Sequence, residues 1–324
     1  LPPRLALGLF NAPEDFGWMK ESKIPWDYRY TYLVGGVNTG ADWSTWNSPP
    51  GEYVTMYLKE SSDAGMIPIF SYYMLVGSNP GGEAEPPEIN LKNTDTMRAF
   101  YNNWKLLMQK SGAFGKIAIV HLEPDLSGYM QQQHGADPTK SIISVASSGF
   151  AEAVGFPNNA VGFSQLLLKL RDTYAPKTLL AWHISAWAAG QDVSIDQTAD
   201  PVALGTQTAN FYKALNANYD LLFFDPADRD AAYSEIVKKD NTRWWNDASV
   251  VRFRQFIATV TAATGKKGVV WQVQIGNRLY RSCNNTNLHY QDNRVEYFLG
   301  PGSAARLTEY AKAGVIAILF GSGG

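Results

Sequence analysis

Acidic residues end two apolar segments of the sequence. The segment Lys116–Asp125 finishes in His-Leu-Glu-Pro-Asp, which contributes Glu123 and Asp125, and Leu221–Asp225 finishes in Asp225. Two carboxyl groups can cleave a glycosidic bond when one protonates the leaving oxygen and the other, ionised, attacks the sugar or activates water. We therefore expect Glu123 to be the general acid and Asp225 the base or nucleophile, with Asp125 tuning or sharing the acid role.

Alternation along a strand predicts where these acids point. In Lys116–Asp125, a strand conformation would put Ile119, His121 and Glu123 on one face. A carboxyl group that aromatic side chains shield from water has the raised pKa that an acid catalyst requires. Two structural alternatives remain open: Glu123 could form an ion pair with an Arg or Lys, and Asp225 could cap a turn.

Other residues near the predicted strand ends are of types that bind sugars. Aromatic rings stack on sugar faces, and amides offer a hydroxyl group both a donor and an acceptor. His183 could bind a hydroxyl or orient a carboxylate, and Asp292 is a reserve candidate for the base. Buried amides, a core histidine and an ordinary solvated loop are the alternatives. The expected binding residues are Trp43, Trp46, Tyr72, His183, Trp187, Asp228, Gln272, Gln274, Asn277, Tyr290 and Asp292.

Eight apolar runs, rich in β-branched and aromatic residues, can position these side chains. Helix-like segments lie between most of the runs, and this alternation predicts a (β/α)8 TIM barrel. Long connections follow the second to seventh runs and short ones precede them, so one rim of the barrel is elaborated, as expected for a cleft at the C-terminal ends of the strands. The runs are Arg4–Phe10, Tyr28–Gly36, Met66–Leu75, Lys116–Asp125, Thr178–Trp187, Leu221–Asp225, Gly268–Asn277 and Gly314–Phe320.

Length and composition narrow the function further. A chain of 324 residues fits one catalytic barrel over residues 1–320, and the Gly-Ser-Gly-Gly end at 321–324 is expected to begin a flexible linker, which could lead to a carbohydrate-binding module. The formal net charge is −2, without basic clusters, so we expect neither nucleic acid nor a membrane as partner. The start without Met suggests processing, and we expect a secreted protein.

Several other chemistries lack their motifs. Leu5–Phe10 holds no His-x-His pair and the chain has no His-Glu-x-x-His, although His121, Glu123, His183 and Asp225 could converge on one ion. Dinucleotide and phosphate loops are absent, as is the Gly-x-Ser-x-Gly of serine hydrolases. We therefore expect no catalytic metal and no cofactor.

With these residues in hand, the chain resembles the catalytic module of a secreted bacterial glycoside hydrolase of the cellulase or β-glucanase kind. Glu123-Pro124 is similar to the Asn-Glu-Pro of clan A, in which the Glu is the acid/base, although Leu122 replaces the Asn and Gln274 stands near the position of that clan's nucleophile Glu. The Glu-Pro-Asp-Leu at 123–126 and Ala-Asp-Arg-Asp-Ala at 227–231 resemble two segments of the inverting cellulases of family 6, in reversed order. That likeness implies Asp125 as proton donor.

The sequence as a whole predicts a TIM-barrel glycosidase that cleaves β-linked polysaccharide or oligosaccharide of the cellulose or β-glucan type. Inversion is preferred over retention, because Asp225 could activate water and no Glu is found on the seventh predicted strand. A non-catalytic carbohydrate-binding barrel is the main alternative, and a metal-dependent isomerase or hydrolase is another. Substitution of Glu123 by Gln and treatment with EDTA would distinguish the three.

Overall fold

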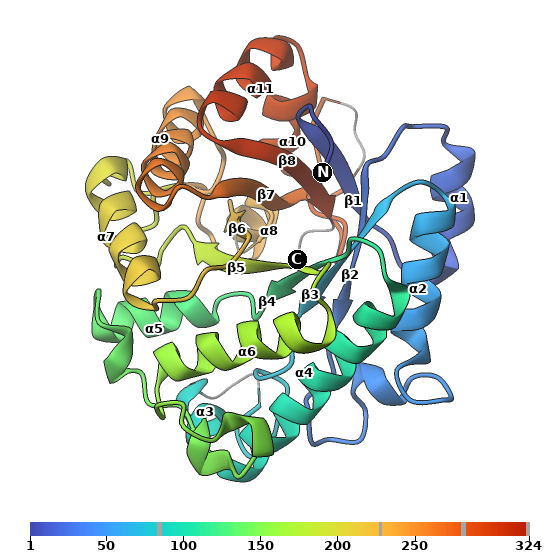
Figure 1. Ribbon diagram of the computed structural model, residues 1–324. Coiled ribbons are helices and arrows are strands. Elements are labelled where there is room, and N and C mark those ends of the chain that lie inside the picture. Colours follow the sequence, from blue (N-terminus) through green and yellow to red (C-terminus); the bar gives the residue numbers. More distant parts are fainter. Residues whose placement is uncertain (83–85, 227–228, 280–282, 322–324) are drawn as a thin grey trace.

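The computed structural model describes residues 1–82, 86–226, 229–279 and 283–321. Eight parallel strands pair in chain order, and the last pairs with the first, so that the sheet closes into a barrel. This confirms the predicted (β/α)8 barrel. Figure 1 shows the strands as an inner ring surrounded by helices. The strands are β1 (Ala6–Phe10), β2 (Tyr28–Leu33), β3 (Ile67–Tyr72), β4 (Ile119–Leu122), β5 (Leu179–Ser185), β6 (Leu221–Asp225), β7 (Lys267–Gln274) and β8 (Val315–Gly321).

Helices connect the strands, and several begin at a residue whose side chain caps them. Asn93 accepts a hydrogen bond from Thr96 N (2.9 Å) at the start of α4, and Asp200 accepts two from the first turn of α7. The α-helices are α1 (Phe16–Glu21), α2 (Glu52–Asp63), α3 (Glu88–Lys92), α4 (Thr94–Phe114), α5 (Leu126–His134), α6 (Ala160–Tyr174), α7 (Pro201–Ala214), α8 (Ala231–Val237), α9 (Asp247–Thr264), α10 (Arg294–Leu299) and α11 (Ser303–Lys312). Short 3-10 helices are η1 (Pro13–Asp15), η2 (Trp43–Thr45), η3 (Pro138–Lys140), η4 (Ala146–Ser148) and η5 (Ala151–Ala153).

Apolar side chains form two main cores, one on each side of the barrel wall. Ile69, Ile119, Ala181, Leu221 and Val269 belong to the inner core, to which all eight strands contribute buried side chains. A larger outer core joins the opposite faces of the strands to the helices. Because the side chains of the inner core fill the interior of the barrel, a substrate cannot pass through it and can bind only at an open end, here called the mouth.

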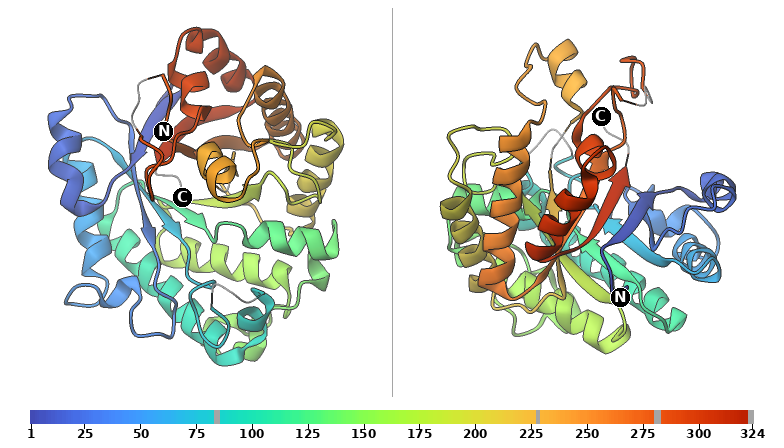
Figure 2. Two further views of the ribbon diagram at one scale, coloured as in Figure 1. Left: turned by 180° about the vertical axis from the view of Figure 1, so that it is seen from behind. Right: turned by 90° about the horizontal axis from the view of Figure 1, so that it is seen from above.

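The C-terminal rim is the elaborated one, as the loop pattern predicts. Residues 123–159 separate β4 from α6 and include α5, and residues 226–246 separate β6 from α9, whereas α9 joins β7 through 265–266 alone. In the right-hand view of Figure 2, α8 projects beyond the strands at one end of the barrel. Within the described residues, no helix has the length and hydropathy needed to cross a membrane. The expected linker comprises residues 321–324: Gly321 is the last residue of β8, and residues 322–324 lie outside the described part of the chain.

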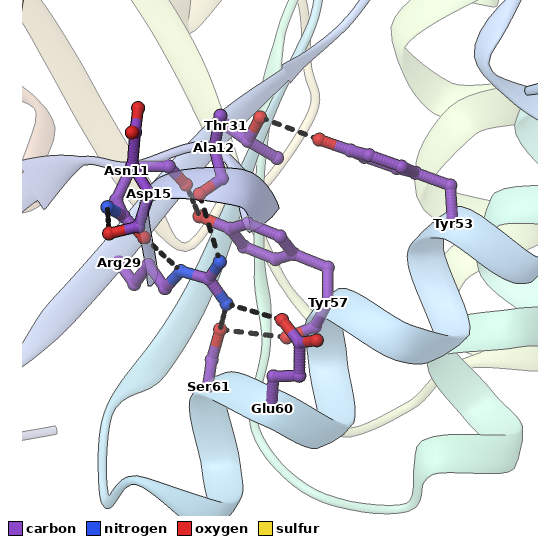
Figure 3. A network of polar contacts seen from close by, with 9 residues as sticks. All are labelled: Asn11, Ala12, Asp15, Arg29, Thr31, Tyr53, Tyr57, Glu60 and Ser61. Carbon is purple, nitrogen blue, oxygen red and sulfur yellow. Dashed lines mark hydrogen bonds and ion pairs between the residues drawn. The ribbon is translucent and has the colours of Figure 1, made fainter. Parts of the chain in front are cut away.

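A buried arginine fastens the end of β1 to α2 (Figure 3). Arg29, on the outer face of β2, is fully buried, and its guanidinium carbon lies 3.8 Å and 4.1 Å from the ring centroids of Phe16 and Tyr57. Its Nε donates to Asn11 Oδ1 (2.9 Å), and one terminal nitrogen pairs with Glu60 (3.2 Å). The loop that leaves β1 is therefore held by hydrogen bonds and by cation–π contacts.

Candidate active site

Alternation along β5 and β6 directs Asp225 into the barrel mouth. Ala181 and Leu221 belong to the inner core and are register partners, as are His183 and Phe223 one layer higher. Ser185 and Asp225 pair in the next layer, at the end of β6. Because side chains two residues apart share a face, Asp225 points to the same side as Leu221 and lies above Phe223. The predicted lumen position of Asp225 is thus supported by the strand register.

Asp125 reaches the same mouth from the turn between β4 and α5. Its backbone is left-handed (φ +68°), and its side chain is 31% exposed, so the carboxylate faces solvent in part. Ser185 Oγ donates to its Oδ1 at 3.5 Å. Gly128 lets α5 approach this closely, since a Cβ there would lie 2.6 Å from Trp187 and 2.7 Å from Ser185 Oγ. The sequence predicts a loop at α5, and the helix is a feature it missed.

Asp125, His183 and Asp225 meet at this point. One oxygen or nitrogen from each lies within 4.8 Å of those of the other two, and His183 Nε2 is 3.7 Å from Asp125 Oδ1. The three atoms can serve glycosidic cleavage, and they are also a donor set that a divalent cation accepts. The structure thus brings together two of the three predicted catalytic acids and one predicted binding residue.

Glu123 does not occupy the predicted position in the mouth. Its φ of +37° interrupts the strand geometry directly after β4, so the alternation used to place it no longer applies. One oxygen accepts hydrogen bonds from the backbone N–H groups of Met74 (3.0 Å) and Leu75 (3.2 Å), and the side chain is 2% exposed. The prediction of a lumen-facing general acid at Glu123 is therefore wrong. Its carboxyl group instead holds the loop that follows β3.

Glu123 should make folding stability depend on pH. Burial raises the pKa of Glu123 from 4.5 to about 8, against the opposing effect of the two backbone N–H groups. Between these values the folded protein keeps a proton that the unfolded chain releases, so stability falls as pH rises through that range. We expect the free energy of unfolding to fall by about 3 kcal/mol more from pH 5 to pH 8 in the wild type than in Glu123→Gln. Urea denaturation at several pH values measures this, and parallel profiles would contradict it.

Three aromatic side chains outside the predicted set form a wall inside the barrel, in which Tyr30 and Trp271 are buried and Tyr32 is half-buried. Tyr30 and Tyr32 on β2 lie near Trp271 on β7, with ring centroids 6.4 Å and 5.9 Å away. Burial raises the pKa of both tyrosines, and the negative charge of Asp225 raises each of them further. The Tyr30 hydroxyl is buried and has no hydrogen-bond partner among the described residues. The alternating tyrosines at 28, 30 and 32 are the sequence signal that could have revealed this wall.

An extra residue in β7 changes which side chains face the lumen. Val270 pairs with Ile318 and Val273 with Phe320, so three steps on β7 match two on β8. Gln272 has a φ of +55° within this bulge, and Gln274 beyond it is fully buried. The Gln272 Oε1 is buried without a hydrogen-bond partner among the described residues. Asn277 is 5% exposed and donates to Ile275 O at 3.1 Å.

Two of the predicted stacking residues belong to the outer core. Trp43 and Tyr72 are fully buried, and both donate to Asn103 Oδ1, at 2.7 Å and 2.9 Å. Tyr72 also packs edge to face against Trp104, with the ring centroids 5.1 Å apart. A ring enclosed on all sides cannot stack on a sugar, so the prediction is wrong for these two residues.

Asp292 is likewise structural. It is fully buried, forms an ion pair with Arg294, and accepts backbone N–H bonds from Ala231 (2.8 Å) and Arg294 (2.7 Å). These contacts fix the start of α8 and leave no carboxylate oxygen exposed to a substrate. The predicted binding or base role of Asp292 is therefore wrong. The predicted residue Asp228 lies outside the described part of the chain.

The remaining aromatic candidates keep accessible surface. Trp46 is 40% exposed. Trp187 lies against Tyr129, with centroids 5.0 Å apart, and Tyr290 lies edge to face against Tyr233 at 5.2 Å. All four residues of the last two pairs are half-buried or exposed, so they can offer a ring face to a ligand.

Comparisons with known proteins agree with the barrel. No family model matches the sequence, and no curated protein matches it. Among solved structures, the GH53 catalytic domain of Ignisphaera aggregans aligns over 99% of this chain and 85% of its own, with a TM-score of 0.53 and 8% identity. One of two fungal β-1,4-galactanases aligns over 98% and 89% (TM-score 0.54, 10% identity), and an endo-1,4-β-xylanase from Caldicellulosiruptor owensensis over 98% and 85% (0.52, 8%). At these identities the likeness is one of fold: the chain shares the TIM-barrel architecture of these glycoside hydrolases.

Proposed function

We propose that this protein is a glycoside hydrolase that cleaves β-linked polysaccharide with Asp125 and Asp225 as its catalytic pair. The observation that carries the proposal is the meeting of these two carboxylates, from the ends of β4 and β6, at the elaborated mouth of the barrel. Tyr32, which is half-buried and packs against Trp271, offers an aromatic face that a sugar ring can contact. Since a polysaccharide does not cross a cell membrane, we also propose that the protein acts outside the cell.

The positions of the two acids suggest different roles. Asp125 lies at the outer edge of the site, 31% exposed, where a leaving group can receive a proton and depart. Asp225 ends β6 on the inner face of the barrel, and its charge raises the pKa of the buried Tyr30, so it is placed to approach the anomeric carbon from within the barrel. We therefore assign Asp125 as general acid and Asp225 as nucleophile.

The short distance between the acids favours retention of the anomeric configuration. Carboxyl groups about 5–5.5 Å apart are typical of retaining glycosidases, whereas inverting enzymes need about 6.5–9.5 Å to hold a water molecule. Oxygens of Asp125 and Asp225 lie within 4.8 Å of each other. This spacing disfavours the inverting mechanism that the sequence analysis preferred. We expect proton NMR of the first products to show the β anomer, and an initial α anomer would contradict the proposed roles.

The substrate class can be tested directly. Because the galactanases and the xylanase named above act on β-1,4 linkages by their titles, β-1,4-galactan and β-1,4-xylan come first, followed by mannan and cellulose. We expect the purified protein to release reducing ends from at least one of them and to keep this activity in EDTA. Binding without release would favour the carbohydrate-binding alternative, and loss of activity in EDTA would favour the metal-dependent one.

A further inference from the structure

Three buried polar side chains from consecutive strands form a row below the acids. Ser71 on β3, His121 on β4 and His183 on β5 are each at most 1% exposed. Ser71 Oγ lies 3.2 Å from His121 Nδ1, and His121 Nε2 lies 2.9 Å from His183 Nδ1. The free ring nitrogen of His183, Nε2, is directed at Asp125 Oδ1 (3.7 Å) and has no hydrogen-bond partner among the described residues. The row therefore connects the interior of the barrel with the proposed catalytic pair.

The acidic residues next to His183 decide which ring nitrogens of the two histidines carry a hydrogen. A neutral imidazole has one N–H and one lone pair. Asp225, the proposed nucleophile, is ionised and lies near His183 Nε2, so an N–H on that nitrogen is attracted to its charge, whereas a lone pair is repelled. His183 Nδ1 then carries the lone pair and must accept from His121 Nε2–H. His121 Nδ1 in turn must accept, and only the Ser71 hydroxyl is placed to donate to it.

We propose that Ser71 and His121 are positioning residues that fix His183 as an Nε2–H donor facing Asp125 and Asp225. The inference rests on the proposed function for its catalytic consequence, whereas the hydrogen positions can be measured without it. Neither Ser71 nor His121 contacts the mouth directly: they act through His183. The N–H that they direct orients the Asp125 carboxyl group for proton transfer, in the way that a fixed tautomer orients a catalytic histidine.

Two substitutions at position 121 separate positioning from packing. In His121→Gln the side-chain amide can donate to His183 Nδ1 and its oxygen can accept from Ser71, whereas His121→Met keeps the volume and removes both bonds. We expect His121→Gln to stay within about threefold of the wild-type kcat, and His121→Met to lose roughly 10- to 100-fold in kcat with little change in KM. Ser71→Ala should fall between them. Equal kcat values for the Gln and Met variants, both folded, would overturn the proposal.

The position of the hydrogen on the His183 ring can be measured independently of any activity. The chain has four histidines, so nitrogen-15 NMR of histidine-labelled protein can assign His183 by comparison with His183→Gln. We expect a protonated Nε2 and an unprotonated Nδ1 on His183 in the wild type and in His121→Gln. A protonated Nδ1 on neutral wild-type His183 would overturn the proposal even if the protein hydrolyses polysaccharide. If no polysaccharide is cleaved, the proposed function fails. The NMR result then tests the proposed hydrogen positions in Ser71, His121 and His183 without it.

Discussion

Asp125→Asn is expected to lower kcat on polysaccharide by about 10²- to 10⁴-fold, whereas Glu123→Gln should stay within about fivefold of the wild type. The two acids are separated by one residue, yet only Asp125 reaches the mouth. Glu123 is buried and accepts hydrogen bonds from the N–H groups of Met74 and Leu75, and the amide oxygen of a Gln there can accept the same bonds. Reducing-end release under saturating substrate measures the contrast.

A substrate with a good leaving group sharpens this test. An activated aryl glycoside needs little protonation, so Asp125→Asn should recover much of its activity on it, as expected when only the general acid is missing. Circular dichroism and the thermal midpoint provide the control for folding. A large loss in folded Glu123→Gln together with an active Asp125→Asn would restore the sequence-based assignment of Glu123 and contradict the one made from the structure.

Asp292→Asn is expected to lower the free energy of unfolding by about 3–5 kcal/mol, because it leaves the charge of Arg294 buried without its counter-ion. Both side chains of this pair are fully buried, and Asp292 also accepts the N–H at the start of α8. Urea denaturation of the two proteins at neutral pH measures the difference.

An exposed ion pair of the same chain provides the matched control. Lys59 and Asp63, one turn apart on α2, have side chains 76% and 58% exposed, and water screens their attraction. Asp63→Asn should therefore leave the denaturation midpoint almost unchanged. If Asp292→Asn is as stable as Asp63→Asn, the buried pair does not hold the segment before α10, and Asp292 becomes available again as a candidate for the site.

The barrel could be predicted from the sequence because its signals are local and repeated. Each strand is an apolar run, and helices such as α4 show their buried side at helical spacing, with Met97, Trp104 and Met108 all fully buried. The long connections after the strands also predicted the elaborated rim. The same alternation puts Asp225 on the inner face of the barrel, since β6 is regular to its last residue.

The errors in the site arise where the backbone leaves regular geometry. Glu123 lies at a left-handed residue, so alternation placed it on the wrong side, and the bulge at Gln272 shifts the second half of β7 by one residue. For Trp43 and Tyr72, residue type suggested stacking, but burial depends on the packing of distant helices around Asn103. The meeting of Asp125 with His183 likewise depends on α5, which composition alone did not indicate.

Hydrolysis by Asp225→Asn tests whether Asp125 and Asp225 are the catalytic pair. We expect the wild-type protein to release reducing ends from a β-linked polysaccharide, and folded Asp225→Asn, which still binds that polymer, to be slower by at least about 10³-fold. A folded Asp225→Asn that keeps wild-type hydrolysis would show that the acids at the ends of β4 and β6 are not the catalytic pair.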